Sequence, residues 1–205
     1  AFLLCVLDHL QEVAPGQQVL ILAPTRELVM QLASVFRSMK TGFSTCLCYG
    51  GHDMDREIHQ LRAHPACIMA TPGRFNDHLR NGRLETQCIS LLILDEYDRC
   101  LELGFYEEMK TIFLALLALH KLLLTSATSQ ENWPDFISWT DKPVLDFSPH
   151  VSSGKTDKFS WQTNDKQEAL LQFLLSSGQT RTIVFFNQRE EVERCAARLS
   201  SHDLP

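Results

Sequence analysis

The 205-residue chain lacks the features that mark several classes of protein. No apolar run approaches the roughly 20 residues that a membrane-spanning helix needs. The apolar stretch at residues 2–7 has no basic flank and is soon broken by Asp8, which argues against a signal peptide. The formal net charge is −6, so any nucleic-acid-binding face must be a local basic strip on an acidic body.

The cysteine and histidine patterns disfavour two further classes. The seven cysteines are odd in number, none forms a C-x-x-C pair, and several lie in apolar runs, where a free thiol behaves as a small hydrophobic group. There is no H-E-x-x-H motif, and His52 and His59 fit a surface pair on one helix better than a metal site. A disulfide framework and a zinc site are therefore not expected. We expect a reducing, cytoplasmic location with no membrane partner.

Short apolar runs alternate with amphipathic stretches along most of the chain. Strands are predicted at residues 19–22, 44–49, 67–70, 91–94, 122–124 and 144–147. Between them, apolar residues at helical spacing predict helices, and Thr25 and Asp53 stand where N-caps belong. Strands that alternate with helices indicate an α/β fold, a doubly wound parallel sheet with helices on both faces.

A polar stretch containing Pro149 and Gly154 divides the chain. We predict a first domain over residues 1–148, a linker over 149–160 and the start of a second α/β domain over 161–205. The second part would hold a helix near 166–175, a strand at 182–186 and a helix near 190–199. A segment this short cannot cover both faces of a parallel sheet. We therefore expect this second unit to be incomplete.

The apolar run at 91–94 leads directly into Asp95 and Glu96, with Asp98 two residues further on. In an open α/β sheet, ligands bind beyond the carboxyl ends of the strands. Phosphoryl transfer needs a carboxylate there to hold Mg²⁺, and a second group to orient or deprotonate the attacking water. Adjacent acids at a strand end supply both roles. Taken alone, the stretch fits equally a turn with solvated acids.

Five short polar signatures follow predicted strands in a definite order. They are Pro24-Thr25-Arg26-Glu27-Leu28, Gly50-Gly51, Thr71-Pro72-Gly73-Arg74, Asp95-Glu96-Tyr97-Asp98 and Ser126-Ala127-Thr128. Each is weak alone, but in this order they resemble the motifs of DEAD-box RNA helicases. Residues 183–187 resemble the first motif of that family's second domain. The resemblance implies a RecA-like first domain followed by the start of a second RecA-like domain.

The same resemblance implies an ATP-dependent RNA helicase, with ATP and Mg²⁺ as cofactors and RNA as partner. Asp95 would hold the metal, through water, and Glu96 would be the catalytic base. Asp98, Ser126, Ala127 and Thr128 would couple ATP hydrolysis to strand separation. RNA would be bound by Pro24, Thr25, Arg26, Gly50, Gly51, Thr71, Pro72, Gly73 and Arg74. The residue types agree, because backbone N–H groups at helix starts favour phosphate.

The chain departs from the family pattern in three ways. Tyr97 replaces an alanine, so local packing must differ. No phosphate-binding loop is present, and by the resemblance that loop and the adenine-reading motif belong before Ala1. The arginine finger belongs beyond Pro205. Gly154-Lys155-Thr156 does not replace the loop, because position 149 is proline where such a loop needs glycine.

Two other functions stay open at this point. The missing phosphate loop and Tyr97 slightly favour an ATPase-deficient, helicase-like RNA-binding or scaffold protein. The intact Asp95, Glu96 and Ser-Ala-Thr motif favour the enzyme. A DNA helicase of the same superfamily fits the Pro-Thr-Arg-Glu-Leu and Ser-Ala-Thr motifs less well. On its own, this chain is expected to lack ATPase activity.

Overall fold

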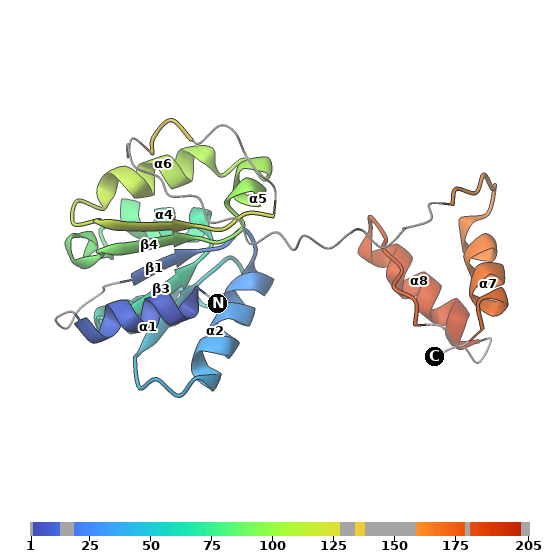
Figure 1. The fold of residues 1–205 in the computed structure, drawn as a ribbon, viewed down its shortest axis with the longest axis horizontal. Helices are drawn as coiled ribbons and strands as arrows, with labels where there is room; N and C mark the ends of the chain where they lie inside the picture. Colours follow the sequence, from blue (N-terminus) through green and yellow to red (C-terminus); the bar gives the residue numbers. More distant parts are fainter. Residues whose placement is uncertain (1, 13–18, 128–133, 138–158, 179–180, 202–205) are drawn as a thin grey trace, which may run out of the picture. The chain divides into compact units, whose positions relative to one another are not determined.

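The structure is a computed structural model and describes residues 2–12, 19–127, 134–137, 159–178 and 181–201. The chain divides into two compact units, residues 1–143 and 144–205. Figure 1 shows the helices and strands of both units. The predicted linker at 149–160 falls largely outside the described residues, so its bounds remain a prediction. Within the described residues, no helix is long and apolar enough to cross a membrane.

The first unit is built on a five-stranded, fully parallel sheet with strand order β2-β3-β1-β4-β5. Its strands are β1 (Val19–Leu22), β2 (Thr45–Cys48), β3 (Cys67–Ala70), β4 (Leu91–Leu94) and β5 (Lys121–Leu124). The three central strands are buried at every position, which explains their continuous apolar runs. The predicted parallel α/β architecture is confirmed. The predicted edge strand at 144–147 lies outside the described residues.

Helices cover both faces of this sheet, as predicted (Figure 1). On one face lie α1 (Leu3–Glu12) and α2 (Arg26–Ser38), against which β1 packs Val19 and Ile21. On the other face, β1 packs Leu20 and Leu22 into a core shared with four more helices. These are α3 (Met54–Arg62), α4 (Pro72–Arg80), α5 (Tyr97–Glu102) and α6 (Tyr106–Ala115). Each fully buried Leu or Ile contributes about 1.5–3 kcal/mol, so the alternation along β1 stabilises both layers.

Local signals set several helix boundaries. Thr25 caps α2 by accepting from the Leu28 N–H at 3.3 Å, and Asp53 caps α3 by accepting from two backbone N–H groups. Both predicted caps are therefore confirmed. Helix α6 ends at Ala115, because Leu116 leaves helical geometry (φ −90°, ψ 74°) and is buried in the core. A short 3₁₀ turn, η1 (Thr86–Cys88), precedes β4.

The second unit contains α7 (Lys166–Ser176) and α8 (Arg189–Ser200), close to the two predicted helices. An ion pair between Arg198 and Glu168 joins them. The predicted strand at 182–186 is wrong: these residues are irregular, and Ile183 and Phe185 are exposed. The physical reason is that a parallel strand exists only with a hydrogen-bonding neighbour, and the described part of this unit offers none.

Candidate functional site

The strands of the sheet all end at one level. In the register, the last residue of β1, Leu22, lies opposite both Ala70 and Leu94, which end β3 and β4. The ladder then continues into the polar signatures. Asp95 donates its N–H to the Leu22 carbonyl at 2.8 Å, and Thr71 donates to Cys48 at 3.0 Å. The structure therefore brings the described residues of the five signatures to one edge of the sheet, as the parallel topology predicts.

Thr125 holds the acidic turn that follows β4. Its Oγ1 donates to Asp95 Oδ1 at 2.5 Å and accepts from the Glu96 N–H at 3.0 Å. Its carbonyl accepts from the Tyr97 N–H at 3.0 Å. Glu96 itself has left-handed backbone geometry, φ 49° and ψ 52°, which costs a non-glycine residue roughly 1–3 kcal/mol and clusters at functional sites. Three bonds to one threonine keep this strained turn in place.

The carboxylates of Asp95 and Glu96 are left for a ligand. Glu96 is exposed and Asp95 is half-buried. Among the described residues, Asp95 Oδ2 makes no hydrogen bond or ion pair, so one hard oxygen remains at the end of β4. Oxygen of this kind suits Mg²⁺, which is normally bound by few carboxylates together with phosphates and water. The site therefore fits the metal role predicted for Asp95.

Tyr97, the residue that departs from the family pattern, is a core residue. It is only 4% exposed and belongs to the apolar cluster that contains Cys100 and Met109. Burial, reinforced by the nearby Asp98 carboxylate, raises the pKa of Tyr97 and keeps the phenol neutral. The large side chain is thus accommodated in the core. A difference in packing from other family members stays a prediction.

The residues predicted to couple hydrolysis to unwinding lie in two segments. Asp98 is 7% exposed and accepts a hydrogen bond from the Arg99 N–H at 3.0 Å. Ser126 and Ala127 follow β5 and are exposed. Thr128 lies outside the described residues. The predicted contact of Ser126 and Thr128 with Asp98 stays a prediction.

Arg26 and the Gly50-Gly51 turn are neighbours. A side chain at Gly51, which has φ +82°, would come within 3.8 Å of Arg26 Nη1. The Arg26 side chain is 58% exposed and pairs with Glu27 at 2.7 Å, an exposed ion pair of little energetic weight. This distance is an ordinary van der Waals contact, so Arg26 and the turn lie side by side at the sheet edge. The contact of Arg26 with a phosphate backbone stays a prediction.

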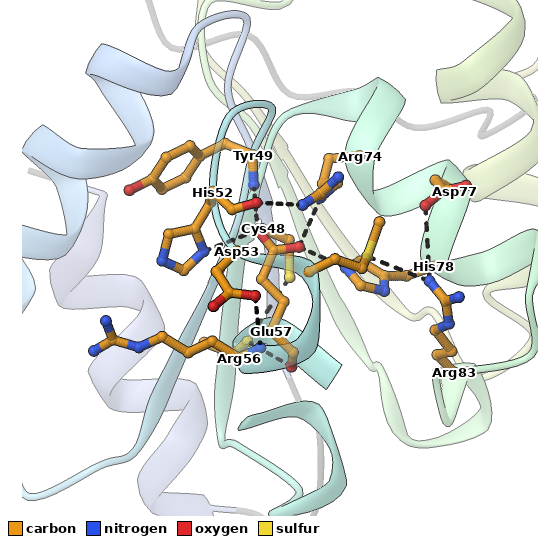
Figure 2. A network of polar contacts seen from close by, with 12 residues as sticks. Cys48, Tyr49, His52, Asp53, Arg56, Glu57, Arg74, Asp77, His78 and Arg83 are labelled. Carbon is orange, nitrogen blue, oxygen red and sulfur yellow. Dashed lines mark hydrogen bonds and ion pairs between the residues drawn. The ribbon is translucent and has the colours of Figure 1, made fainter. Parts of the chain in front are cut away.

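Arg74 belongs to a buried network centred on Glu57 of α3 (Figure 2). Glu57 is fully buried. Its Oε2 accepts from Arg74 Nε and from His78 Nε2, each at 2.7 Å. Its Oε1 lies 2.9 Å from His52 Nδ1 and accepts from the Tyr49 N–H at 3.2 Å. Four groups from two segments, the β2–α3 connection and α4, therefore converge on one carboxylate.

These contacts keep Glu57 ionised. Burial alone would raise the pKa of Glu57, but the hydrogen bonds from His78, Arg74 and His52 outweigh burial and lower it below 4.5. Arg74 also donates from Nη2 to the His52 carbonyl at 2.8 Å, and its side chain is only 17% exposed. Arg74 is thus anchored through two of its three nitrogens, an arrangement that the sequence pattern does not reveal.

The same cluster has the composition of a metal site but not its chemistry. Cys48, Glu57 and His78 each offer a ligand atom, all within 4.8 Å of one another. However, both Glu57 oxygens already accept hydrogen bonds, and the Arg74 cation lies 2.7 Å from Oε2, where it repels a metal ion. Hydrogen bonding with Cys46 and burial raise the pKa of the Cys48 thiol, which disfavours the thiolate that binds metal. We interpret the cluster as a hydrogen-bond network.

Sequence reasoning missed Thr125 and Glu57. A signal existed for each. Thr125 is a hydroxyl residue directly after a strand that neighbours β4. Glu57 and Leu61 are spaced four residues apart on the buried face of α3, and an acid at such a position requires partners.

Comparison with known proteins identifies the family. A family model described as DEAD/DEAH box helicase matches residues 1–136. The chain belongs to the DEAD/DEAH box helicase family. ATP-dependent RNA helicase DeaD of Escherichia coli (strain K12) is 39% identical over 134 residues, covering 64% of this chain and 21% of the relative. ATP-dependent RNA helicase RhlB of Pseudomonas aeruginosa (strain UCBPP-PA14) is 31% identical over 223 residues, covering 100% of this chain and 56% of the relative.

Solved structures of DEAD-box proteins share the fold. A hypothetical ATP-dependent RNA helicase from Sulfolobus tokodaii has a TM-score of 0.56 and 29% identity, over 62% of this chain and 38% of that one. A DEAD box protein from Methanococcus jannaschii has a TM-score of 0.50 and 33% identity, over 56% of this chain and 32% of that one. The predicted RecA-like fold is confirmed. This DEAD-box chain spans only about a fifth to somewhat over half of the curated relatives' length.

Proposed function

We propose that the protein to which this chain belongs is an ATP-dependent RNA helicase. Membership of the DEAD/DEAH box family supports RNA helicase function in general. The observation that carries the finer proposal is the acidic turn, in which Thr125 fixes both Asp95 and Glu96 at the sheet edge. A carboxylate exposed beside a hard-oxygen ligand is the arrangement that nucleotide hydrolysis requires.

In this proposal the two acids divide the work of hydrolysis. Asp95 would hold Mg²⁺, which neutralises charge on the nucleotide phosphates when bound. Glu96 orients a water molecule and accepts its proton as the water oxygen attacks the γ-phosphorus. The bond from that phosphorus to the bridging oxygen then breaks, giving ADP and phosphate. The sequence holds no phosphate-binding loop motif, and the activity is proposed for the protein to which this chain belongs.

RNA would bind along the same edge through its backbone. Arg26, exposed beside Gly51, and Arg74, at the first turn of α4, are the cations of this surface. Thr71 precedes α4, and among the described residues its side chain makes no capping hydrogen bond, so its hydroxyl is available to a phosphate. Contacts of this kind position the nucleic acid without reading its bases.

The test is RNA-stimulated ATPase activity of the full-length protein carrying Glu96→Gln. Loss of a general base typically costs 10²–10⁴-fold, so turnover should fall by about that factor while nucleotide binding persists. Glu102→Gln is the matched control, because Glu102 is an exposed acid of α5 that pairs only with Arg99 among the described residues. Near-normal turnover of the Glu96 variant would refute its role. A wild-type protein that binds RNA without hydrolysing ATP would instead support a helicase-like scaffold.

A further inference from the structure

Glu57 is the most completely bonded side chain around the proposed RNA-binding edge, and the proposed mechanism gives it no role. It is fully buried on α3, yet its four partners come from the β2–α3 segment and from α4. Two of the family signatures, Gly50-Gly51 and Thr71-Pro72-Gly73-Arg74, are therefore joined through one carboxylate (Figure 2). A buried charge is retained only at the cost of desolvation, so its partners matter.

The geometry of Arg74 shows what the carboxylate does. Nε donates to Glu57 Oε2 at 2.7 Å and Nη2 donates to the His52 carbonyl at 2.8 Å. Among the described residues, Nη1 has no hydrogen bond or ion pair. Because a guanidinium is planar and rigid, fixing two of its nitrogens also fixes the direction of the third. Arg74 is thus prevented from reorienting, and its Nη1 stays unused.

His78 is a second donor to the Glu57 oxygen that Arg74 bonds. Its Nε2 lies 2.7 Å from Glu57 Oε2, and a carboxylate only accepts, so Nε2 carries the proton. Its Nδ1 is buried and has no hydrogen-bond partner among the described residues. His78 therefore acts as a donor that helps to orient the carboxylate. Arg74 is the permanent cation among the partners of Glu57.

We infer that Glu57 is a positioning residue for RNA binding, which clamps Arg74 so that Nη1 is presented to a backbone phosphate. The inference rests on the proposed RNA-binding function. It assigns to a buried acid of α3 a role in binding a polyanion, although a negative charge near the site by itself repels RNA. The same carboxylate also holds the Gly50-Gly51 turn close to α4, since Glu57 accepts from the Tyr49 N–H.

The experiment measures RNA affinity of the full-length protein against salt concentration for Glu57→Gln and for Asp77→Asn. Asp77 is a matched control, because it lies on α4, pairs with Arg83 at 3.8 Å and does not contact Arg74 in the described structure. Both changes remove one negative charge, which on general electrostatic grounds strengthens RNA binding. We expect Glu57→Gln to weaken binding roughly tenfold, as for a lost charged hydrogen bond. The slope of the logarithm of RNA affinity against the logarithm of salt concentration should become shallower by about 0.7 for each phosphate contact that is lost.

A double-mutant cycle with Arg74→Ala separates the two proposals. If Glu57 acts through Arg74, then Glu57→Gln has no further effect on affinity or salt slope in the Arg74→Ala background. An unchanged affinity for Arg74→Ala would refute the phosphate contact in the proposed function. A weakened Arg74→Ala beside a wild-type-like Glu57→Gln would refute only the clamp.

Arg74→Lys keeps the test decisive if the Glu57 variant fails to fold. Lysine retains the charge and has three N–H donors, but they share one nitrogen and cannot occupy the separate positions of Nε, Nη1 and Nη2. We expect Arg74→Lys to weaken RNA binding and to reduce its dependence on salt concentration, as Arg74→Ala does. Binding equal to wild type with lysine would show that charge alone suffices and would overturn the inference.

Discussion

Thr125→Val should uncouple the acidic turn from the sheet while changing the shape of one side chain very little. The substitution replaces a hydroxyl that donates to Asp95 at 2.5 Å and accepts from the Glu96 N–H at 3.0 Å. A hydrogen bond to a charged group contributes about 1.5–3 kcal/mol and a neutral one about 0.5–1.5 kcal/mol. Because the turn is partly exposed, water replaces some of this, and we expect the first unit to lose about 2 kcal/mol of unfolding free energy.

The effect on activity should exceed the effect on stability. Glu96 has left-handed geometry, and without the Thr125 hydroxyl the turn is free to relax toward an unstrained conformation. Displacing a catalytic group by about 1 Å commonly costs on the order of 10²-fold in rate. Turnover of the full-length protein should therefore fall by about that factor, measured as RNA-stimulated ATP hydrolysis beside urea unfolding. Thr125→Ser restores the hydroxyl and should recover most of both losses. If Thr125→Val turns over like wild type, the hydroxyl does not position the acids.

Four further outcomes are expected. Tyr97→Ala should cost about 3 kcal/mol of unfolding free energy, because it opens a cavity beneath α5; a neutral result in urea unfolding would contradict its packing role. Since the network lowers the pKa of Glu57 below 4.5, its stabilisation is complete above that pH and is lost as the pH falls through the lower folded value. The difference in unfolding free energy between wild type and Glu57→Gln should thus become smaller as the pH is lowered. A difference that does not change with pH would argue against an ionised Glu57. Arg26→Ala should weaken binding equally for RNAs of different sequence, as competition binding would show. A chelator should leave the unfolding temperature of the isolated, nucleotide-free protein unchanged. A lower unfolding temperature with chelator would indicate a bound metal, for which the cluster around Cys48 is the candidate site.

Much of the fold could be predicted because its signals are local. Continuous apolar runs such as 91–94 specify strands buried on both faces, and the alternation with helices specifies a parallel sheet. Thr25 and Asp53 act on backbone groups within three residues, so a cap can be recognised from sequence alone. The carboxyl ends of parallel strands lie at one edge of a sheet, so the topology alone predicts that Asp95 lies at the same edge as the other signatures.

Only the tertiary structure decided the partners of the buried charges. Glu57 meets Arg74 and His78 across 17 and 21 residues, because α3 and α4 share one face of the sheet. Thr125 reaches Asp95 across 30 residues through neighbouring strands. The predicted strand at 182–186 is not formed, which also reflects long-range pairing. Its apolar residues suit a sheet, but a strand needs hydrogen bonds from a neighbouring strand, and the described part of the second unit supplies none. Local sequence fixes propensity, whereas the long-range pairing of polar groups depends on which distant segments the fold brings within about 3 Å.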